Sequence, residues 1–271
     1  MKISVFYDHV REAAGQKGKP EKALLEELYQ AGIRGLEIRL RDLLEDQTLF
    51  ERISGAGFSV SGIYEFYDME KKGETEKAEK HIDTAVKTGC RQILAVPGFL
   101  DQKEAGEFHR LADKKDQNGL EAFMKDSREI AGMCQGLSFM TARGQEKGIR
   151  VTVEDFDDAA SPLSRTLGIR WFLEQVPGLG FTFDTGNFAF LKEDIWEAWK
   201  ILSPFVLHVH CKDRRAGLEP APAGGGEIPM KELLGKLRET GYKGWLAAEH
   251  FGARDQEAFM LESAEFLRKY R

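Results

Sequence analysis

Two histidines lie two residues apart in the apolar stretch FVLHVHCKD, residues 205–213. If this stretch is a β-strand, His208 and His210 point to the same face, because side chains alternate along a strand. A pair of hydrogen-bonded core histidines would explain this motif by itself. The rest of the chain therefore has to decide whether the two imidazoles serve a site.

Three other apolar stretches end in a carboxylate. Glu154 follows VTV, Asp184 follows FTF and Glu249 follows LAA. One acidic residue at a strand end is commonly a helix cap or a salt-bridge partner. Three carboxylates brought together would repel one another and raise each other's pKa unless a cation lay between them. Three oxygen donors and one imidazole suit a divalent ion, Mn, Co, Mg or Zn, so the pattern predicts a metal site.

Eight strand-like stretches alternate with helix-like stretches along the chain. The strands are expected over residues 2–7, 35–40, 58–66, 91–98, 149–156, 179–187, 205–213 and 244–251. This alternation predicts parallel strands joined by helical crossovers, and eight units in 271 residues fit an α/β protein with a closed (β/α)8 TIM barrel, formed by residues 1–271 as a single domain. An open doubly wound sheet is the alternative, but no G-x-G-x-x-G turn follows the first strand. In a barrel, the strand ends that carry the carboxylates and histidines meet at one mouth.

Helices are expected between these strands, where apolar residues recur at three-and-four spacing. They are predicted over residues 21–32, 75–89, 228–241 and 253–270. The stretch 118–148 contains few helix breakers and is expected to form one long helix. The stretch 98–118 is polar and is expected to be a long loop that could act as a lid.

The segments VEDF, FDTGN, HVHCKD and AAEH, in this order and spacing, resemble the xylose-isomerase-like barrels. That family includes sugar phosphate isomerases/epimerases, ketose 3-epimerases and hydroxypyruvate isomerases. The resemblance implies that Glu154, Asp184, His210 and Glu249 bind one divalent metal ion, and that Glu154 and Glu249 are the catalytic acid and base flanking a sugar substrate. His208, one pleat deeper in the strand, is expected beside the site or in the barrel core rather than on the metal.

Substrate contacts are expected from several polar residues at the same strand ends. They are Asn187, Lys212, Arg214, Glu65 and, by its position behind His210, His208. Many members of the family have a histidine at the position of Asn187, and an amide can donate a hydrogen bond but cannot carry a proton. The substrate is therefore left open, as is the choice between epimerisation and aldose–ketose isomerisation. The amides of Gly224–Gly226 could hold a phosphate.

Bulk composition limits the other possibilities. A net charge of −6 argues against a nucleic-acid partner, because phosphate binding needs a concentrated basic surface. Cys90, Cys134 and Cys211 are widely spaced and odd in number, as in proteins with reduced thiols. No apolar stretch approaches the length of a membrane span, so the expectations are a cytoplasmic location, no membrane partner and a small-molecule sugar or sugar phosphate as the ligand. A homo-oligomer is compatible with the sequence.

Two other functions share this kind of barrel. An abasic-site nuclease of the endonuclease IV type would need a multi-metal cluster with several histidines, and the chain has six histidines in all. A sugar-binding or regulatory barrel could keep the metal and lack turnover. Because both glutamates expected to move protons are present, the sequence favours an isomerase or epimerase that works through a metal-stabilised enediolate.

Overall fold

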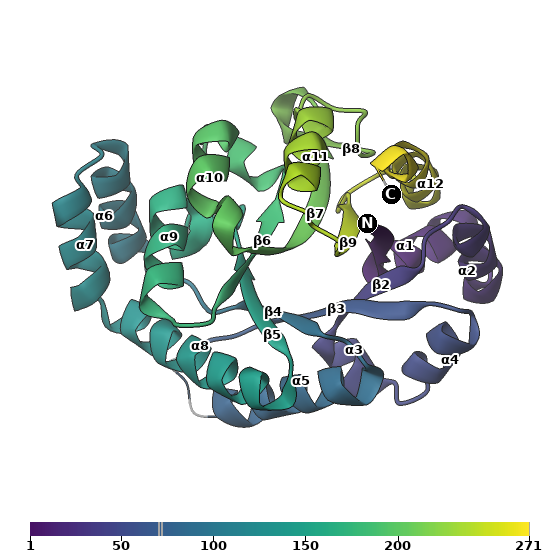
Figure 1. Ribbon diagram of the computed structural model, residues 1–271, viewed down its shortest axis with the longest axis horizontal. Helices are drawn as coiled ribbons and strands as arrows, with labels where there is room; N and C mark the ends of the chain where they lie inside the picture. The colour runs from purple at the N-terminus through teal and green to yellow at the C-terminus, as the bar shows by residue number, and fades with distance from the viewer. Residues whose placement is uncertain (70, 72, 271) are drawn as a thin grey trace.

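The computed structural model describes residues 1–69, 71 and 73–270, and its strands close into a barrel (Figure 1). The hydrogen-bonded order is β6-β5-β4-β3-β2-β1-β9-β7, and β7 pairs with β6 to close the ring. All of these pairings are parallel, so the predicted TIM barrel is confirmed. The barrel strands are β1 (Lys2–Phe6), β2 (Gly35–Arg39), β3 (Ser59–Phe66), β4 (Gln92–Val96), β5 (Arg150–Glu154), β6 (Gly180–Asp184), β7 (Val206–Arg214) and β9 (Trp245–Glu249). The short β8 (Pro220–Ala221) pairs antiparallel with the end of β7.

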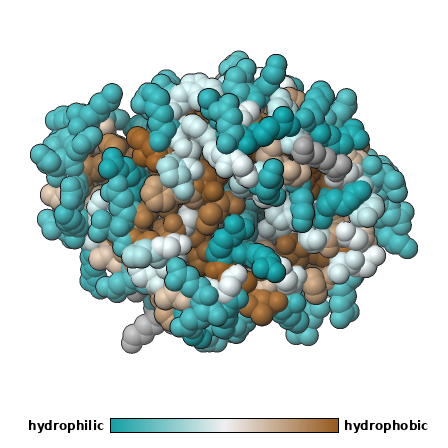
Figure 2. Space-filling model, in the orientation of Figure 1, coloured by the Kyte–Doolittle hydropathy of each residue, from teal (hydrophilic) through white to brown (hydrophobic). Residues whose placement is uncertain are grey.

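Helices surround the strands and cover their outer faces (Figure 1). Their bounds are α1 (Tyr7–Lys17), α2 (Glu21–Gln30), α3 (Leu40–Glu45), α4 (Leu49–Gly55), α5 (Glu74–Thr88), α6 (Gln102–Asp113), α7 (Gln117–Asp126), α8 (Arg128–Lys147), α9 (Thr166–Gln175), α10 (Ile195–Leu202), α11 (Met230–Glu239) and α12 (Gln256–Leu267). Strand β4, with the sequence QILAV, is buried at every position, as parallel strands between a packed interior and a helical layer should be. Figure 2 shows hydrophilic residues over most of the rim of one face and hydrophobic residues nearer its centre.

The stretch 98–118, expected to be a loop, contains a helix. Asp101 caps α6 by accepting a hydrogen bond from the Glu104 amide, and Phe108 of the same helix is fully buried. The loop expectation is therefore wrong for residues 102–113, where local capping and one apolar face outweigh the polar composition. Movement of this segment as a lid stays a prediction.

The stretch 118–148 forms two helices rather than one. Helix α7 ends at Asp126, and Ser127 takes up an extended conformation. The Ser127 hydroxyl accepts a hydrogen bond from the Ile130 amide and so caps α8. A serine can accept a hydrogen bond from a free amide in the first turn of a new helix. This contact lowers the free-energy cost of a break between two helices at this position.

The ends of the barrel differ, and we name them by strand direction. The upper mouth lies at the carboxyl ends of the parallel strands, where β5 ends at Glu154 and β6 at Asp184. The lower mouth lies at the amino ends, where β1 begins at Lys2 and β5 at Arg150. Among the described residues, no helix is both long and apolar enough to cross a membrane.

Candidate metal centre

Four side chains from neighbouring strands meet inside the upper mouth. They are Glu154 of β5, Asp184 of β6, His210 of β7 and Glu249 of β9, and they form what we call the carboxylate–histidine cluster. All four are buried, and one potential ligand atom from each lies within 4.8 Å of the others. The barrel brings them together because β5, β6, β7 and β9 follow one another around the ring.

The imidazole of His210 lies at the centre of this cluster. Its Nδ1 atom is 3.0 Å from Glu154 Oε2, 3.1 Å from Glu249 Oε2 and 4.0 Å from Asp184 Oδ2. Burial lowers the pKa of this imidazole, but the surrounding carboxylates outweigh that effect and raise it well above its usual value. The Nδ1 atom of His210 therefore points to a position where the three carboxylates stabilise positive charge.

Asp184 supplies direct support for a cation in this cluster. Its Oδ1 atom accepts hydrogen bonds from the amides of Gly186 and Asn187, whereas its Oδ2 atom is buried without a hydrogen-bond partner. Burial raises the pKa of Asp184 well above its usual range. A buried carboxylate oxygen of this kind is costly unless it binds a proton or a metal ion. Three oxygen donors and one nitrogen donor suit Mn, Co, Mg or Zn, so the residues present fit a divalent ion.

Lys212 lies beside the cluster and supplies one positive charge. Its Nζ atom is 2.7 Å from Glu249 Oε1, 3.2 Å from Asp157 Oδ2 and 3.8 Å from Asp184 Oδ2. Burial alone would raise the pKa of Glu249, but Lys212 and His210 outweigh it and hold that pKa below its usual value. Lys212 alone does not balance the three carboxylates. In the metal-free protein the protonated His210 and the raised pKa of Asp184 offset the remaining negative charge, and a bound divalent ion would take over that role.

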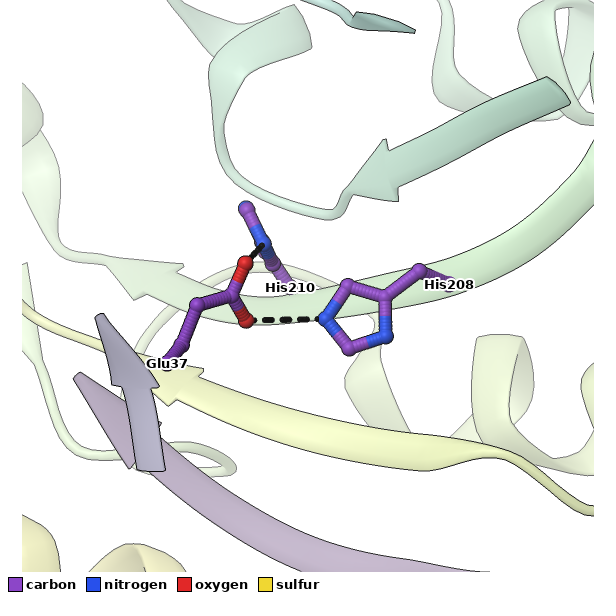
Figure 3. Close-up of side chains that lie close together, drawn as sticks. All are labelled: Glu37, His208 and His210. Carbon is purple, nitrogen blue, oxygen red and sulfur yellow. Dashed lines mark hydrogen bonds and ion pairs between the residues drawn. The ribbon is translucent and has the colours of Figure 1, made fainter. Parts of the chain in front are cut away.

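Glu37 is a buried part of this centre that our sequence reasoning missed. Its Oε2 atom is 2.9 Å from His208 Nε2, and its Oε1 atom is 3.1 Å from His210 Nε2, so the carboxylate bridges the two histidines (Figure 3). Burial would raise the pKa of Glu37, but the charges of His210 and His208 lower it to about 2. The available signal was the motif GLEIRL, where a single carboxylate interrupts an apolar strand.

The Glu37 bridge determines how His210 can bind a metal ion. When Nε2 donates a hydrogen to Glu37, the lone pair of Nδ1 is free for a cation, as in the carboxylate–histidine pairs of known metal sites. His208 lies on the other side of Glu37 from His210 and does not line the neighbouring cavity, and its contact with a substrate stays a prediction. Glu37, His208 and His210 also form a second group with metal-ligand spacing. Because both histidine Nε2 atoms already pair with Glu37, we treat this group as support for the first site.

Comparison with known proteins agrees with this architecture. The sequence profile of the xylose isomerase-like TIM barrel family matches residues 25–270. The chain belongs to this family. The rhizopine catabolism protein MocC of Rhizobium meliloti is 22% identical, over 89% of this chain and 77% of MocC.

Solved structures with the same fold include enzymes of different kinds. The probable 3-DHS dehydratase AsbF of Bacillus anthracis superposes with a TM-score of 0.72 at 15% identity, covering 99% of both chains. The D-allulose 3-epimerase of a Methylomonas species gives a TM-score of 0.69 at 15% identity, covering 100% of this chain and 98% of the epimerase. Identities this low establish the fold and leave the reaction to be argued from the site.

In this xylose isomerase-like barrel, the cluster opens into a cavity of about 380 Å³. Aromatic rings form much of its wall, and the polar lining includes Asn187 and Lys212, whose contact with a substrate stays a prediction. The Asn187 amide group donates to the backbone oxygen of Asp155 and lies 3.5 Å from Arg214 Nη2. Arg214 itself is outside the lining; it pairs with Asp157 and donates to the backbone oxygen of Leu218.

Glu65 is also outside the lining of this cavity. Its carboxylate accepts from the guanidinium of Arg39, with Nη2 at 3.1 Å, and from the amides of Arg41 and Phe66. Arg39 lines the cavity instead, and sequence reasoning missed it. Glu65 therefore holds Arg39 in place, and a direct role in substrate binding stays a prediction.

The glycine loop after β7 has no free backbone donors. The carboxylate of Asp213 accepts hydrogen bonds from the amides of Gly224 and Gly226, at 2.9 and 3.0 Å, and the Gly225 amide donates to the backbone oxygen of Pro222. A phosphate would have to displace these bonds. The expectation that the Gly224–Gly226 amides hold a phosphate therefore has no support in this geometry.

Proposed function

We propose that this protein is a divalent-metal-dependent isomerase or epimerase of unphosphorylated sugars. The observation that carries the proposal is the carboxylate–histidine cluster, in which three carboxylates and one imidazole converge and Asp184 Oδ2 has no hydrogen-bond partner. Glu154, Asp184, His210 and Glu249 would hold the ion. When bound, it would polarise a substrate carbonyl and stabilise the negative charge that develops when a neighbouring C–H proton leaves.

In this proposal Glu154 and Glu249 would move protons on opposite sides of a substrate. They lie on β5 and β9, the two outer strands of the four that carry the cluster, with β6 and β7 between them. One carboxylate removes a proton from carbon and the other can return one. If the proton returns to the same carbon from the opposite face, the stereocentre is inverted. If it returns to the adjacent carbon, an aldose and a ketose are interconverted.

The cavity wall suits a substrate with both hydroxyl groups and exposed C–H bonds. Phe6, Phe66 and Phe156 offer apolar surface, and Asp8 and Asn187 offer polar atoms. Tyr64 donates its hydroxyl hydrogen to Asp8 at 2.6 Å, which holds that carboxylate toward the cavity. Such a mixture is typical of small-molecule sites in which a few polar groups orient the ligand.

The pairing of cations supports an unphosphorylated substrate. Arg39 pairs with Glu65, and Lys212 pairs with Glu249, so each lining cation already faces a carboxylate. The amides of the glycine loop are occupied by Asp213 and Pro222. A phosphate group would enter without a free cation or a free backbone donor, at an unfavourable desolvation cost.

The two rival functions find less support. A nuclease site would need several histidines on its metals, and in the described part of the chain only His208 and His210 belong to groups with metal-ligand spacing. A binding barrel without turnover would not need two carboxylates on opposite sides of the substrate.

The absence of a nucleic-acid partner, the cytoplasmic location and the oligomeric state all stay predictions.

The experiment that tests the proposal measures metal first and proton exchange second. Protein is dialysed against chelator, offered Mn, Co, Mg or Zn, and its metal content is determined by elemental analysis, with Asp184→Asn as the variant. We expect about one ion per wild-type chain and loss of the ion in the variant. Loaded protein is then incubated in D₂O with free ketoses and with their phosphates, and deuterium on carbon is followed by NMR. Binding of none of the four metals would overturn the proposal.

A further inference from the structure

A second cavity, of about 240 Å³, opens at the lower mouth of the barrel, at the opposite end from the carboxylate–histidine cluster. Its lining comes from the first residues of β1, β3, β4, β5 and β9 and from the turns just before them. Four of the lining residues are cations, namely Lys2, Arg91, Arg150 and Lys243, and the lining contains no carboxylate. In a chain with a net charge of −6, this is an unusual concentration of positive charge.

These four cations lack ionic partners. None of them makes an ion pair with any described carboxylate, although ion pairs are frequent elsewhere on the surface, as between Arg143 and Glu79. Arg150 donates one hydrogen bond to the neutral side chain of Gln92, at 3.3 Å. Lys2 lies over the ring of Trp245, 5.0 Å from its centroid. Like charges held around one cavity repel, and an anion between them would relieve that repulsion.

A buried hydroxyl group in the same cavity also lacks a partner. Ser61 lines the cavity, is 2% exposed, and its Oγ atom makes no hydrogen bond. Such groups are rare in folded proteins, because an unmade buried hydrogen bond is unfavourable. The Ser61 hydroxyl therefore has an unused donor beside the wall of the cavity.

The backbone near Ser61 makes room for the ring of Trp245. A Cβ atom at Gly35 would lie 2.7 Å from the Trp245 ring and 2.9 Å from Ser61 Cβ, so only glycine fits there. Small residues on β2 and β3 thus allow the indole of Trp245 to turn into the lower mouth, where it forms one wall of the cavity. The cavity combines cations, a hydroxyl donor and an aromatic wall.

From this arrangement we propose that the lower mouth binds the phosphate group of a small phosphorylated molecule. A phosphate dianion offers three acceptor oxygens, which match guanidinium and ammonium donors and the free hydroxyl of Ser61. The two arginines supply planar donor pairs, and Lys2 and Lys243 supply point charges. The site is independent of the sugar site in the upper mouth, because the two share no lining residue.

The test uses full-length, metal-loaded protein and two probes, inorganic phosphate and glycerol phosphate. Binding is followed by titration calorimetry and by the change in intrinsic tryptophan fluorescence, to which Trp245 contributes. We expect saturable binding of one equivalent. The double variant Arg91→Gln/Lys243→Gln should bind about 100-fold more weakly, since each lost charge-assisted contact reduces affinity by about tenfold. Both residues are exposed, so the substitutions leave the core intact.

A matched control separates this site from general charge effects. Lys22→Gln/Lys231→Gln removes the same charge from two exposed lysines outside the cavity, and should leave the affinity unchanged. Ser61→Ala should weaken binding roughly fivefold if its hydroxyl donates to the phosphate.

Tighter binding of glycerol phosphate than of inorganic phosphate would identify an ester as the ligand, and equal binding would identify the phosphate group alone. The absence of saturable binding, or equal affinities in the two double variants, would overturn the proposal. Neither double variant touches the carboxylate–histidine cluster, so metal content and proton exchange report separately on the sugar reaction.

Discussion

The two mouths of this barrel differ in how their charged side chains are paired. In the upper mouth, the cations that line the cavity face carboxylates, as Arg39 faces Glu65 and Lys212 faces Glu249. In the lower mouth, four cations share a cavity whose lining has no carboxylate. The upper mouth holds an excess of negative charge around His210, whereas the lower mouth holds only positive charge.

Burial explains why the two ends can differ so much. The carboxylates of the upper mouth are buried, and a buried charge without a partner is strongly destabilising, so Glu37, His210 and Lys212 have to be paired. The ends of Lys2, Arg91, Arg150 and Lys243 reach solvent, where water and salt screen them. Position in the barrel therefore decides which end must neutralise its charge within the protein and which can leave it for a ligand.

The largest effect is expected from a change in the carboxylate–histidine cluster of the upper mouth. Glu249→Gln keeps the size of the side chain but removes a carboxylate that, in the proposed reaction, takes or returns a proton. We expect exchange of substrate C–H into D₂O, measured by NMR, to fall between about 10²- and 10⁴-fold. Glu262→Gln, on the exposed face of α12, is the control and should retain full exchange. Undiminished exchange in Glu249→Gln would remove this residue from the chemistry.

A smaller effect is expected from the residue that orients His210. Glu37→Gln replaces one of the two acceptor oxygens by a donor, so one of the two histidine N–H groups loses its partner. Metal affinity, measured by competition with a chelator dye, should fall roughly 10- to 100-fold. Glu65→Gln alters a buried carboxylate on the adjacent strand that contacts Arg39, and its metal affinity should stay near that of wild type. Equal metal affinities in wild type, Glu37→Gln and Glu65→Gln would show that metal binding does not depend on the hydrogen bond from His210 to Glu37.

The pH dependence of metal binding tests the same region. In the metal-free protein the neighbouring carboxylates raise the pKa of His210, so the imidazole carries a proton near neutral pH that an incoming ion must displace. The apparent affinity should therefore fall as pH is lowered, by about tenfold per unit between about pH 7 and 6. Competition titrations across that range measure the slope. An affinity that does not change with pH would mean that His210 binds no proton that the metal replaces.

The smallest effect is expected when the lower mouth receives a carboxylate of its own. Ser59 is exposed and lines that cavity, so Ser59→Asp would place a negative charge among the four cations. We expect the free energy of unfolding to rise by about 0.5 kcal/mol at low salt, and the gain to vanish in about 1 M salt. Ser59→Asn is the uncharged control. Equal stability of the two variants at low salt would show that the cations do not repel appreciably.

Short sequence patterns predict much of the fold and part of the candidate site. The alternation of strands and helices predicts the barrel, and the carboxylates that end three apolar stretches predict the cluster at its upper mouth, because strand ends meet there by topology. Helix α6 was missed although Asp101, followed by Glu104, is a capping pattern. The break at Ser127 was missed because helix periodicity continues on both sides of it.

Side-chain partners are harder to predict than strands. The role of Glu37 was missed because its two histidine partners lie across the barrel. No local sequence pattern predicts a contact between β2 and β7. The occupied amides of Gly224 and Gly226 depend in the same way on the direction of one side chain, Asp213. The cations of the lower mouth come from four separate strand beginnings, so only the closed ring shows that they share one cavity.

The Glu37 bridge also ties metal binding to the order of folding. Glu37 and His208 are 171 residues apart in the chain, and β1 and β9 separate their strands in the ring. Contacts of such long range form late, after local helices and neighbouring strand pairs. The segment from Glu154 to Glu249 contains every expected metal ligand, yet it lacks the carboxylate that orients one of them. During refolding, tight metal binding should therefore appear only when the first and last strands join, which makes the ion a reporter of ring closure.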